Sequence, residues 1–249
     1  MMWPHLEFGY SVCRIFGDSE VMALRNRINA QIIDVLAEYD SEAYRLLKNE
    51  DDPLSVYHKL GSKESYGSTW IKANRILSDA DTAWIESTSG IMALRNSFGS
   101  TKTSDEELLG RGNYYWRLTR PGAKDDVGPM HRDAWFWELN DNFGHDMSGL
   151  RRVKVWIAVE TAPGLNGLLV QPGSHLREDL EWNGTVSGGI TKPVLKTQLD
   201  PSSLTLLSPP PGHGVIFHDR LLHGGAVNTA TRCRCSIEFT LLVPTNPIH

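Results

Sequence analysis

The chain has 249 residues, of which 40% are hydrophobic and 22% are charged, and its formal net charge at pH 7 is −5. This composition is typical of a globular protein with one large domain or two small ones. The negative charge offers no basic surface for nucleic acid, no apolar run approaches the roughly 18 residues of a membrane span, and we expect no signal peptide. The sequence therefore predicts a cytoplasmic protein that binds a small molecule and no membrane, and its oligomeric state stays unknown.

The first part of the chain, residues 1–110, is predicted to be mostly helical. A β-prone run at residues 10–16 is followed by apolar residues at helical spacing, which predicts a helix over residues 17–40 with Asp18 or Ser19 as its cap. Residues 41–60 are predicted to continue as helix and then loop. A further helix is predicted over residues 80–97, with Trp84, Ile91 and Leu94 on one face, although Gly90 lies in its middle.

The remaining residues, 111–249, have a different pattern of short β-prone runs separated by Gly, Pro, Asn and Asp turn signals. These runs cover residues 113–120, 153–160, 167–175, 214–219 and 235–243. Helices followed by many short strands predict an α+β fold that is mainly β, with a sandwich or barrel in the second part. No linker separates the two parts, so we expect a single domain over residues 1–249.

The segment GPMHRDAWFW, residues 128–137, combines a histidine and a carboxylate with three aromatic residues. On a strand, His131 and Asp133 would project to the same side and could bind one metal ion. Trp135 and Trp137 would continue in that register, so we expect them to line a substrate pocket beside the ion. We assign Arg132 to the same pocket.

A third ligand must come from elsewhere, and two histidines near the C-terminus are candidates. His223 is followed by Arg234 and Ser236, which share one face of a predicted strand. Two histidines and one carboxylate leave positions on Fe(II) open for a keto acid and O₂. A guanidinium and a hydroxyl can bind the second carboxylate of that keto acid if it is a dicarboxylate. His218 is the competing ligand, although its place within a predicted strand favours a hydrogen-bonded core histidine.

Four segments of the chain carry a resemblance to a known family. They are FGYSVCRIFGDSEVMALRNRI near the N-terminus, HRD at residues 131–133, VKVWIAVETAPGLNGLLVQPGSH at residues 153–175 and FHDRLLHGGAVNTATRCRCSI at residues 217–237. Because of these segments, most of the chain resembles the phytanoyl-CoA dioxygenase family of Fe(II)/2-oxoglutarate-dependent oxygenases.

The resemblance implies a double-stranded β-helix, a jelly-roll or cupin-like core with N-terminal helices packed on one sheet. It implies that His131, Asp133 and His223 bind the iron. Arg234 then anchors the C5 carboxylate of 2-oxoglutarate, and Trp156 forms a wall of the same pocket. Ser236 follows an Arg-x-Ser pattern that is common in the wider superfamily. The lysine or arginine that provides a second contact to 2-oxoglutarate in the family is not identifiable here, and Arg117 is a candidate for it.

Five of the eight tryptophans fall between residues 116 and 182. Indole rings stack on the apolar faces of sugars and donate to hydroxyls, so we also assign Trp116 to the substrate pocket. The segment from RLTRPG to GPMHRDAWFW is similar to oxygenases that tailor sugar-containing antibiotics. We therefore expect a small polar, possibly sugar-containing metabolite or natural product as substrate.

Several reactions are compatible with these residues. Hydroxylation and oxidative cyclisation would both consume O₂ and release succinate and CO₂, and ascorbate would support either in vitro. Asp133 keeps a carboxylate that related halogenases replace, so the resemblance implies oxygen transfer or hydrogen abstraction rather than halogenation. The alternatives are a non-redox cupin-like metalloenzyme and a sugar-binding jelly roll without catalysis.

Overall fold

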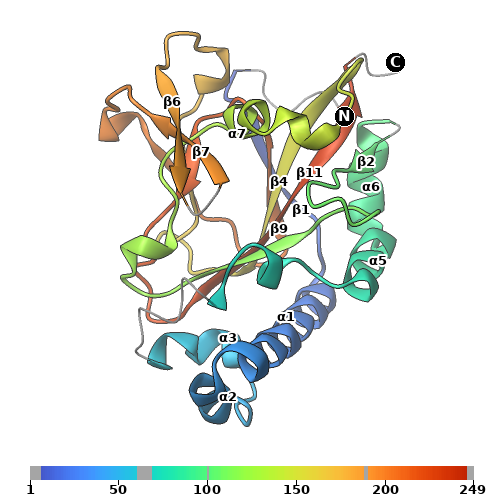
Figure 1. Cartoon of the computed structure of the whole chain (residues 1–249), viewed down its shortest axis with the longest axis vertical. Coiled ribbons are helices and arrows are strands. Elements are labelled where there is room, and N and C mark those ends of the chain that lie inside the picture. The colour runs from blue at the N-terminus through green and yellow to red at the C-terminus, as the bar shows by residue number, and fades with distance from the viewer. Residues whose placement is uncertain (1–6, 61–68, 100, 188–189, 246–249) are drawn as a thin grey trace.

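The computed structural model describes residues 7–60, 69–99, 101–187 and 190–245. In these ranges a larger antiparallel sheet faces a smaller one, and helices cover the outer side of the larger sheet (Figure 1). The major sheet has the order β1-β9-β4-β11-β2, and β3 also pairs with β11. Its strands are β1 (Tyr10–Arg14), β2 (Lys102–Thr103), β3 (Tyr115–Thr119), β4 (Leu150–Glu160), β9 (His213–His218) and β11 (Arg234–Pro244).

The minor sheet has the order β10-β5-β8, and a separate hairpin joins β6 to β7. These strands are β5 (Leu168–Val170), β6 (Trp182–Ser187), β7 (Ile190–Leu195), β8 (Thr205–Leu207) and β10 (His223–Gly225). The α-helices are α1 (Asp18–Tyr39), α2 (Ser41–Leu47), α3 (Pro53–Val56), α5 (Asp79–Ser87), α6 (Ser89–Ser97) and α7 (Asp133–Leu139). The facing antiparallel sheets agree with the predicted jelly roll.

Helix α1 forms where the apolar spacing predicts it. Leu24, Ile28, Ile32 and Leu36 follow one another at four-residue intervals, and all four are buried against the sheet. The predicted cap is wrong, because the N-cap is Gly17 and neither Asp18 nor Ser19. The carboxylate of Glu20 accepts a hydrogen bond of 2.7 Å from the Gly17 backbone N–H, so the first turn is held from within the helix.

The helix predicted over residues 80–97 is in fact two helices, α5 and α6. The chain is extended at Thr88, which ends one helix and caps the next. Gly90 follows this break at a point where a β-carbon would lie 1.7 Å from the carbonyl oxygen of Ile15. Glycine is therefore required there by the close approach of the β1 end, and Ile91 and Leu94 are buried as the pattern predicts.

Strands β4 and β11 separate two different environments. Their register pairs Glu238 with Trp156 and Thr240 with Lys154, so these four side chains share the face toward the minor sheet. The alternate residues on the two strands, among them Val155 and Phe239, pack with the helices in one large apolar core. A smaller core fills part of the space between the sheets, so the functional groups of the inner face lie beside it.

Five described strands, β2, β6, β7, β8 and β10, were not predicted. Each has only two to six residues. Runs of that length carry little periodicity, and their pairing depends on longer neighbouring strands. Among the described residues no helix is both long enough and apolar enough to cross a membrane.

Candidate metal centre

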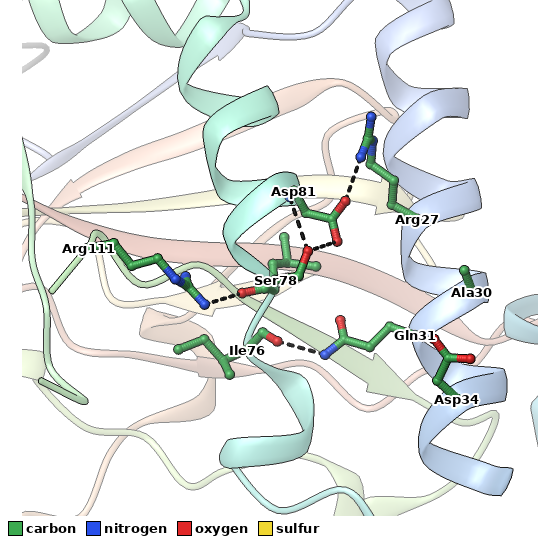
Figure 2. A pocket seen from close by; sticks show the side chains of 9 residues that line it. Arg27, Ala30, Gln31, Asp34, Ile76, Ser78, Asp81 and Arg111 are labelled. Carbon is green, nitrogen blue, oxygen red and sulfur yellow. Dashed lines mark hydrogen bonds and ion pairs between the residues drawn. The ribbon is translucent and has the colours of Figure 1, made fainter. Parts of the chain in front are cut away.

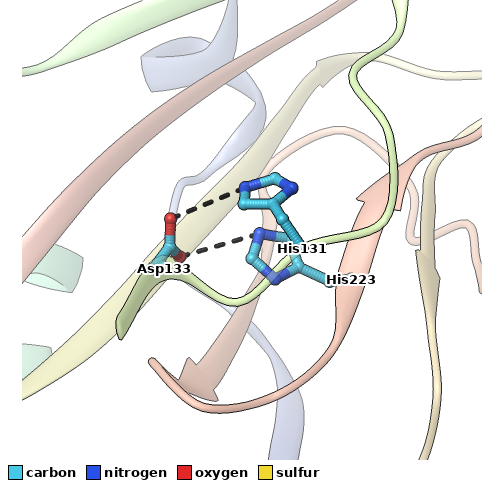
Figure 3. Close-up of side chains that lie close together, drawn as sticks. All are labelled: His131, Asp133 and His223. Atoms are coloured by element: carbon cyan, nitrogen blue, oxygen red, sulfur yellow. Dashed lines mark ion pairs between the residues drawn. The ribbon is translucent and has the colours of Figure 1, made fainter. Parts of the chain in front are cut away.

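The two histidines of the candidate centre are brought together by backbone pairing. His131 forms an isolated antiparallel bridge with His223, the first residue of β10. The His131 N–H donates to the His223 carbonyl at 2.8 Å, and the reciprocal hydrogen bond is 2.9 Å. The chain then enters α7, whose first residue is Asp133, and this turn places the carboxylate against both imidazoles (Figure 3).

The three side chains converge on a single point. The Nε2 atom of His223 is 3.6 Å from Asp133 Oδ2, and the Nε2 atom of His131 is 3.9 Å from Asp133 Oδ1. All three residues offer ligand atoms within 4.8 Å of one another, and His223 and Asp133 are buried. His218, the competing candidate, lies outside this group, and its Nδ1 is 3.1 Å from the backbone N of Arg220.

Both imidazoles are oriented by backbone carbonyls. His131 Nδ1 is 2.9 Å from the carbonyl oxygen of Pro129, and His223 Nδ1 is 3.0 Å from that of Leu221. A proton on each Nδ1 satisfies these carbonyls and leaves the Nε2 lone pairs directed at the Asp133 side. This arrangement is the one that metal-binding histidines use to fix their tautomer.

The electrostatics keep the ligands in their metal-binding protonation states. Burial alone would raise the pKa of Asp133, but Lys154 and the two histidines lower it below its usual range. Burial lowers the pKa of His223 to about 4, so its imidazole is neutral at pH 7. A carboxylate and a neutral buried imidazole are ligands for a divalent transition metal.

The residues present fit an iron ion. The carboxylate oxygen Asp133 Oδ2 is buried and accepts no hydrogen bond from any described residue. A buried carboxylate oxygen without a donor is costly unless a cation binds it. Two nitrogens and one oxygen on one side of an ion form the two-histidine, one-carboxylate set typical of non-haem Fe(II).

The predicted co-substrate residues lie on the same inner face. Arg234 is buried at the start of β11, donates to Thr119 Oγ1 at 2.7 Å and to the Gly167 carbonyl, and lies 5.9 Å from the Trp156 ring centroid. Ser236, two residues further on, has a buried hydroxyl without a hydrogen-bond partner among the described residues. This group can receive an anion with two oxygens.

Lys154 is a charged neighbour of the candidate centre that the sequence pattern did not single out. Its ammonium lies 3.8 Å from Asp133 Oδ1, and its side chain is only 12% exposed. Burial would lower the pKa of Lys154, but Asp133 and Glu238 raise it, so the side chain is a cation. A single lysine in the apolar strand VKVWIAVE, on the same face as Trp156, is the signal that could have identified it.

Arg117, the candidate second contact to 2-oxoglutarate, is half exposed and pairs with Glu238 at 2.7 Å.

The structure corrects the local geometry of the HRDAWFW segment. It is not a strand, because α7 begins at Asp133. At about 100° per residue, Trp137 returns to the face of Asp133 whereas Trp135 points to the opposite side. Trp135 accordingly stacks on Trp182 of the β6–β7 hairpin at 5.1 Å, and Trp137 packs edge-on against Phe143 at the same distance.

Two other expected pocket residues lie elsewhere. Trp116 is on the outer face of the major sheet, where its indole N–H donates to Gln31 of α1 at 3.0 Å. It pairs in register with Ile237, so the strand alternation excludes it from the inner face. Arg132 is buried at the N-cap of α7, where it donates to the backbone carbonyls of Ser174 and Arg177. These hydrogen bonds connect the start of α7 to the segment that follows β5.

A surface cavity of about 500 Å³ lies on the helical side of the molecule and is separate from the metal centre (Figure 2). Arg27 and Asp81 line it and pair with each other at 2.6 Å, and Arg111 in its wall donates to the Leu77 carbonyl. Because Arg27, Asp81 and Arg111 are already engaged with groups of the protein, the cavity is a weaker candidate site than the metal centre.

The facing sheets and the convergent ligands define a metal-binding jelly-roll protein, and comparison with solved structures agrees. EvdO2 from Micromonospora carbonacea var. aurantiaca, crystallised with 2-oxoglutarate, superposes with a TM-score of 0.61 at 15% identity, covering 97% of this chain and 91% of EvdO2. EctD from S. alaskensis, crystallised with 2-oxoglutarate and 5-hydroxyectoine, gives 0.54 at 16% identity, with 95% and 73% covered. AviO1 from Streptomyces viridochromogenes Tue57 gives 0.52 at 14% identity, with 97% and 93% covered. Identities this low establish the fold alone.

The family is established by sequence. The profile of the phytanoyl-CoA dioxygenase (PhyH) family matches residues 9–236, whereas no individual protein of curated function matches the chain. The chain therefore belongs to the phytanoyl-CoA dioxygenase family, and it is a 2-oxoglutarate-dependent oxygenase with Fe(II) as its metal.

Proposed function

We propose that this oxygenase acts on a small polar metabolite or natural product, such as one that contains a sugar, by hydroxylation or oxidative cyclisation. The observation that carries the oxygenase assignment is the convergence of His131, Asp133 and His223 beside the Arg234–Ser236 pair on one wall. We infer that residues 1–249 act as a single domain, because β1 and β2 from the helical part pair with β9 and β11.

In this proposal His131, Asp133 and His223 hold Fe(II), which with 2-oxoglutarate and O₂ supplies the oxidising chemistry and releases succinate and CO₂. Arg234 and Ser236 bind the C5 carboxylate, and the indole of Trp156 closes that end of the pocket. The crystal structures of EvdO2 and EctD with 2-oxoglutarate support this co-substrate. Arg117 and Lys154 are cations near Glu238 on the inner face that could provide a second contact.

The substrate side of the pocket is proposed to lie along α7. Trp137 shares the face of Asp133. Trp135 of α7 stacks on Trp182 of β6, so this pair joins α7 to the β6–β7 hairpin. Flat aromatic surfaces next to hydrogen-bonding groups suit a ring with hydroxyl substituents. Since Asp133 occupies the ligand position that a halide would need, oxygen transfer or hydrogen abstraction is the expected outcome.

Uncoupled turnover tests the oxygenase assignment without knowledge of the substrate. Purified protein with Fe(II), ascorbate and 2-oxoglutarate under air should release succinate slowly, and omitting 2-oxoglutarate or O₂ should abolish this release. If the protein binds metal but forms no succinate, the non-redox metalloenzyme becomes the better assignment.

A matched pair of histidine variants tests the ligand set. His223→Ala should remain folded but bind Ni(II), a redox-inert substitute, much more weakly, because a direct ligand is lost. His218→Ala should keep its metal and lose only about 1–3 kcal/mol of stability, because it removes hydrogen bonds rather than a ligand. Titration calorimetry with Ni(II) and a thermal melt measure the two effects, and the opposite pattern would reassign the third ligand.

A further inference from the structure

Three aromatic rings surround the ammonium of Lys72, and one of them, Phe136, lies on α7 three residues after Asp133. The ammonium of Lys72 is 4.8 Å from the ring centroid of Tyr115, 5.4 Å from that of Phe143 and 5.9 Å from that of Phe136. It also pairs with Glu107 and, at 3.4 Å, with Glu106. We call the five side chains around this ammonium the cation cage: Tyr115, Phe136, Phe143, Glu106 and Glu107. Three aromatic rings with carboxylates form the usual recognition site for an alkylammonium group.

The backbone is strained where it supplies one wall of the cage. Asp141, Asn142 and Phe143 have φ angles of 48°, 51° and 52°, a left-handed run of three non-glycine residues. Each such residue is conformationally costly, and strain of this kind is concentrated at binding sites. The turn directs Phe143 toward Phe136 of α7, where the ring centroids are 5.5 Å apart.

The cage adjoins the metal centre on two sides. Phe136 follows Asp133 by three residues on α7, so the two side chains are neighbours on one helix face. On the other side, Glu106 accepts a hydrogen bond of 3.2 Å from Thr240, which pairs in register with Lys154. The ammonium of Lys154 in turn lies 3.8 Å from Asp133. Two side chains, Thr240 and Lys154, therefore connect the cage to Asp133 along this side.

The cage is built for a cation that can exchange. The side chain of Glu106 is only 7% exposed, and its Oε1 atom is oriented by Ser104 and Thr240, which leaves Oε2 for the ammonium. Because burying a carboxylate without a positive partner is costly, a cation in the cage stabilises Glu106. Lys72 itself is 31% exposed, so its flexible side chain can swing into water when another cation replaces it.

We propose that the cation cage binds a positively charged amine of the substrate, and that Lys72 occupies the cage in its absence. The inference rests on the proposed function and narrows the substrate class to amine-bearing polar molecules, such as an amino sugar. A neutral substrate would gain nothing by displacing Lys72, whereas an alkylammonium group replaces the same cation–π contacts and ion pairs.

The test removes the internal cation and supplies an external one. Lys72→Met keeps the length of the side chain without its charge, and tetramethylammonium chloride is the probe, with sodium chloride at equal ionic strength as the reference. The variant should bind tetramethylammonium at least about tenfold more tightly than the wild type, measured by Trp fluorescence or calorimetry. Adding Phe143→Leu to Lys72→Met should reverse that gain.

A matched control comes from Lys48, whose ammonium lies 5.6 Å from the single ring of Tyr44 and has no cage around it. Lys48→Met should leave tetramethylammonium binding unchanged. Lys72→Gln provides a second uncharged variant if Lys72→Met melts too early. Equal binding by Lys72→Met, Lys72→Gln and the wild type, or binding that survives Phe143→Leu, would overturn the proposal.

Measuring succinate release without substrate, in Lys72→Met and in the wild type, distinguishes a failure of this inference from a failure of the proposed function. If the variant gains tetramethylammonium binding while neither it nor the wild type forms succinate, the cage stands as a cation site and the oxygenase assignment fails. If both form succinate and neither binds the probe, the oxygenase assignment stands and the amine-bearing substrate is excluded.

Discussion

The two faces of strands β4 and β11 differ in chemistry although their residues alternate along the same two segments. On the outer face, Val155, Ile157 and Phe239 are fully buried and belong to the large apolar core that includes residues of the helices. On the inner face, Lys154 and Glu238 alternate with them as charged groups of low exposure. Burying charges costs free energy, and pairing recovers only part of it. The outer face therefore stabilises the fold, whereas the inner face carries buried charged groups that cost stability.

The largest expected effect is on the outer face. Phe239→Ala should lower the free energy of unfolding by about 3–5 kcal/mol, because it leaves a cavity beneath the helices. Denaturant unfolding measures this loss. At temperatures where the variant stays folded, its affinity for Ni(II) should equal that of the wild type. A specific loss of metal affinity in a folded variant would show that the two faces are coupled.

The next effect is on the inner face and concerns affinity. Arg234→Ala should weaken 2-oxoglutarate binding by on the order of 2–5 kcal/mol, since it removes a buried charge-assisted partner. Calorimetry with 2-oxoglutarate in the presence of Ni(II) measures this loss, and metal affinity should change little. Arg232, two residues earlier, is exposed, so Arg232→Ala is the matched control. Weaker binding in the control alone would identify Arg232 as the anchor.

A smaller effect is expected at Lys154. Lys154→Met should destabilise the metal-free protein by about 3 kcal/mol, because Asp133 loses its nearest cation. Ni(II) should stabilise the variant more than it stabilises the wild type, since a dication then binds Asp133 without repulsion from an ammonium. Thermal melts with and without Ni(II) measure both effects. An equal rise in Tm for the two proteins would contradict this role for Lys154.

The smallest effect concerns the ion pairs that attach the helical layer. Burial would raise the pKa of Asp52, but hydrogen bonds from Arg25, Ser55 and Asn29 lower it to about 2, from an ordinary 3.8. The stabilisation is therefore complete above pH 4 and is lost as the pH falls through 2. Asp52→Asn should cost on the order of 1 kcal/mol at pH 7, because the pair is partly exposed, and the difference from the wild type should vanish near pH 2. A pH series of urea unfolding curves checks both points.

The sequence predicted helix α1 and the strands β1, β3, β4, β5, β9 and β11, each of which lies in or overlaps a run that its residue pattern marks. It also placed His131 and Asp133 together, but for the wrong reason. The run of aromatics in DAWFWEL is compatible with a strand or a helix, and an acidic residue at the first position favours a helix start. The short strands β8 and β10 of the minor sheet escaped prediction because their pairing, rather than their own residues, makes them strands.

The sequence by itself determined which kinds of residue are available for chemistry. It also determined the family that uses them. Side-chain chemistry is local, so two histidines, a carboxylate and an Arg-x-Ser pair limit the possible ligands before any folding is considered. Only the tertiary structure decided which groups meet. The bridge of His131 to His223, the burial of Lys154 beside Asp133 and the removal of Trp116 to the outer face all depend on pairings between segments far apart in the chain. Strand register sets these contacts, and a shift of one residue would exchange the two faces of the sheet.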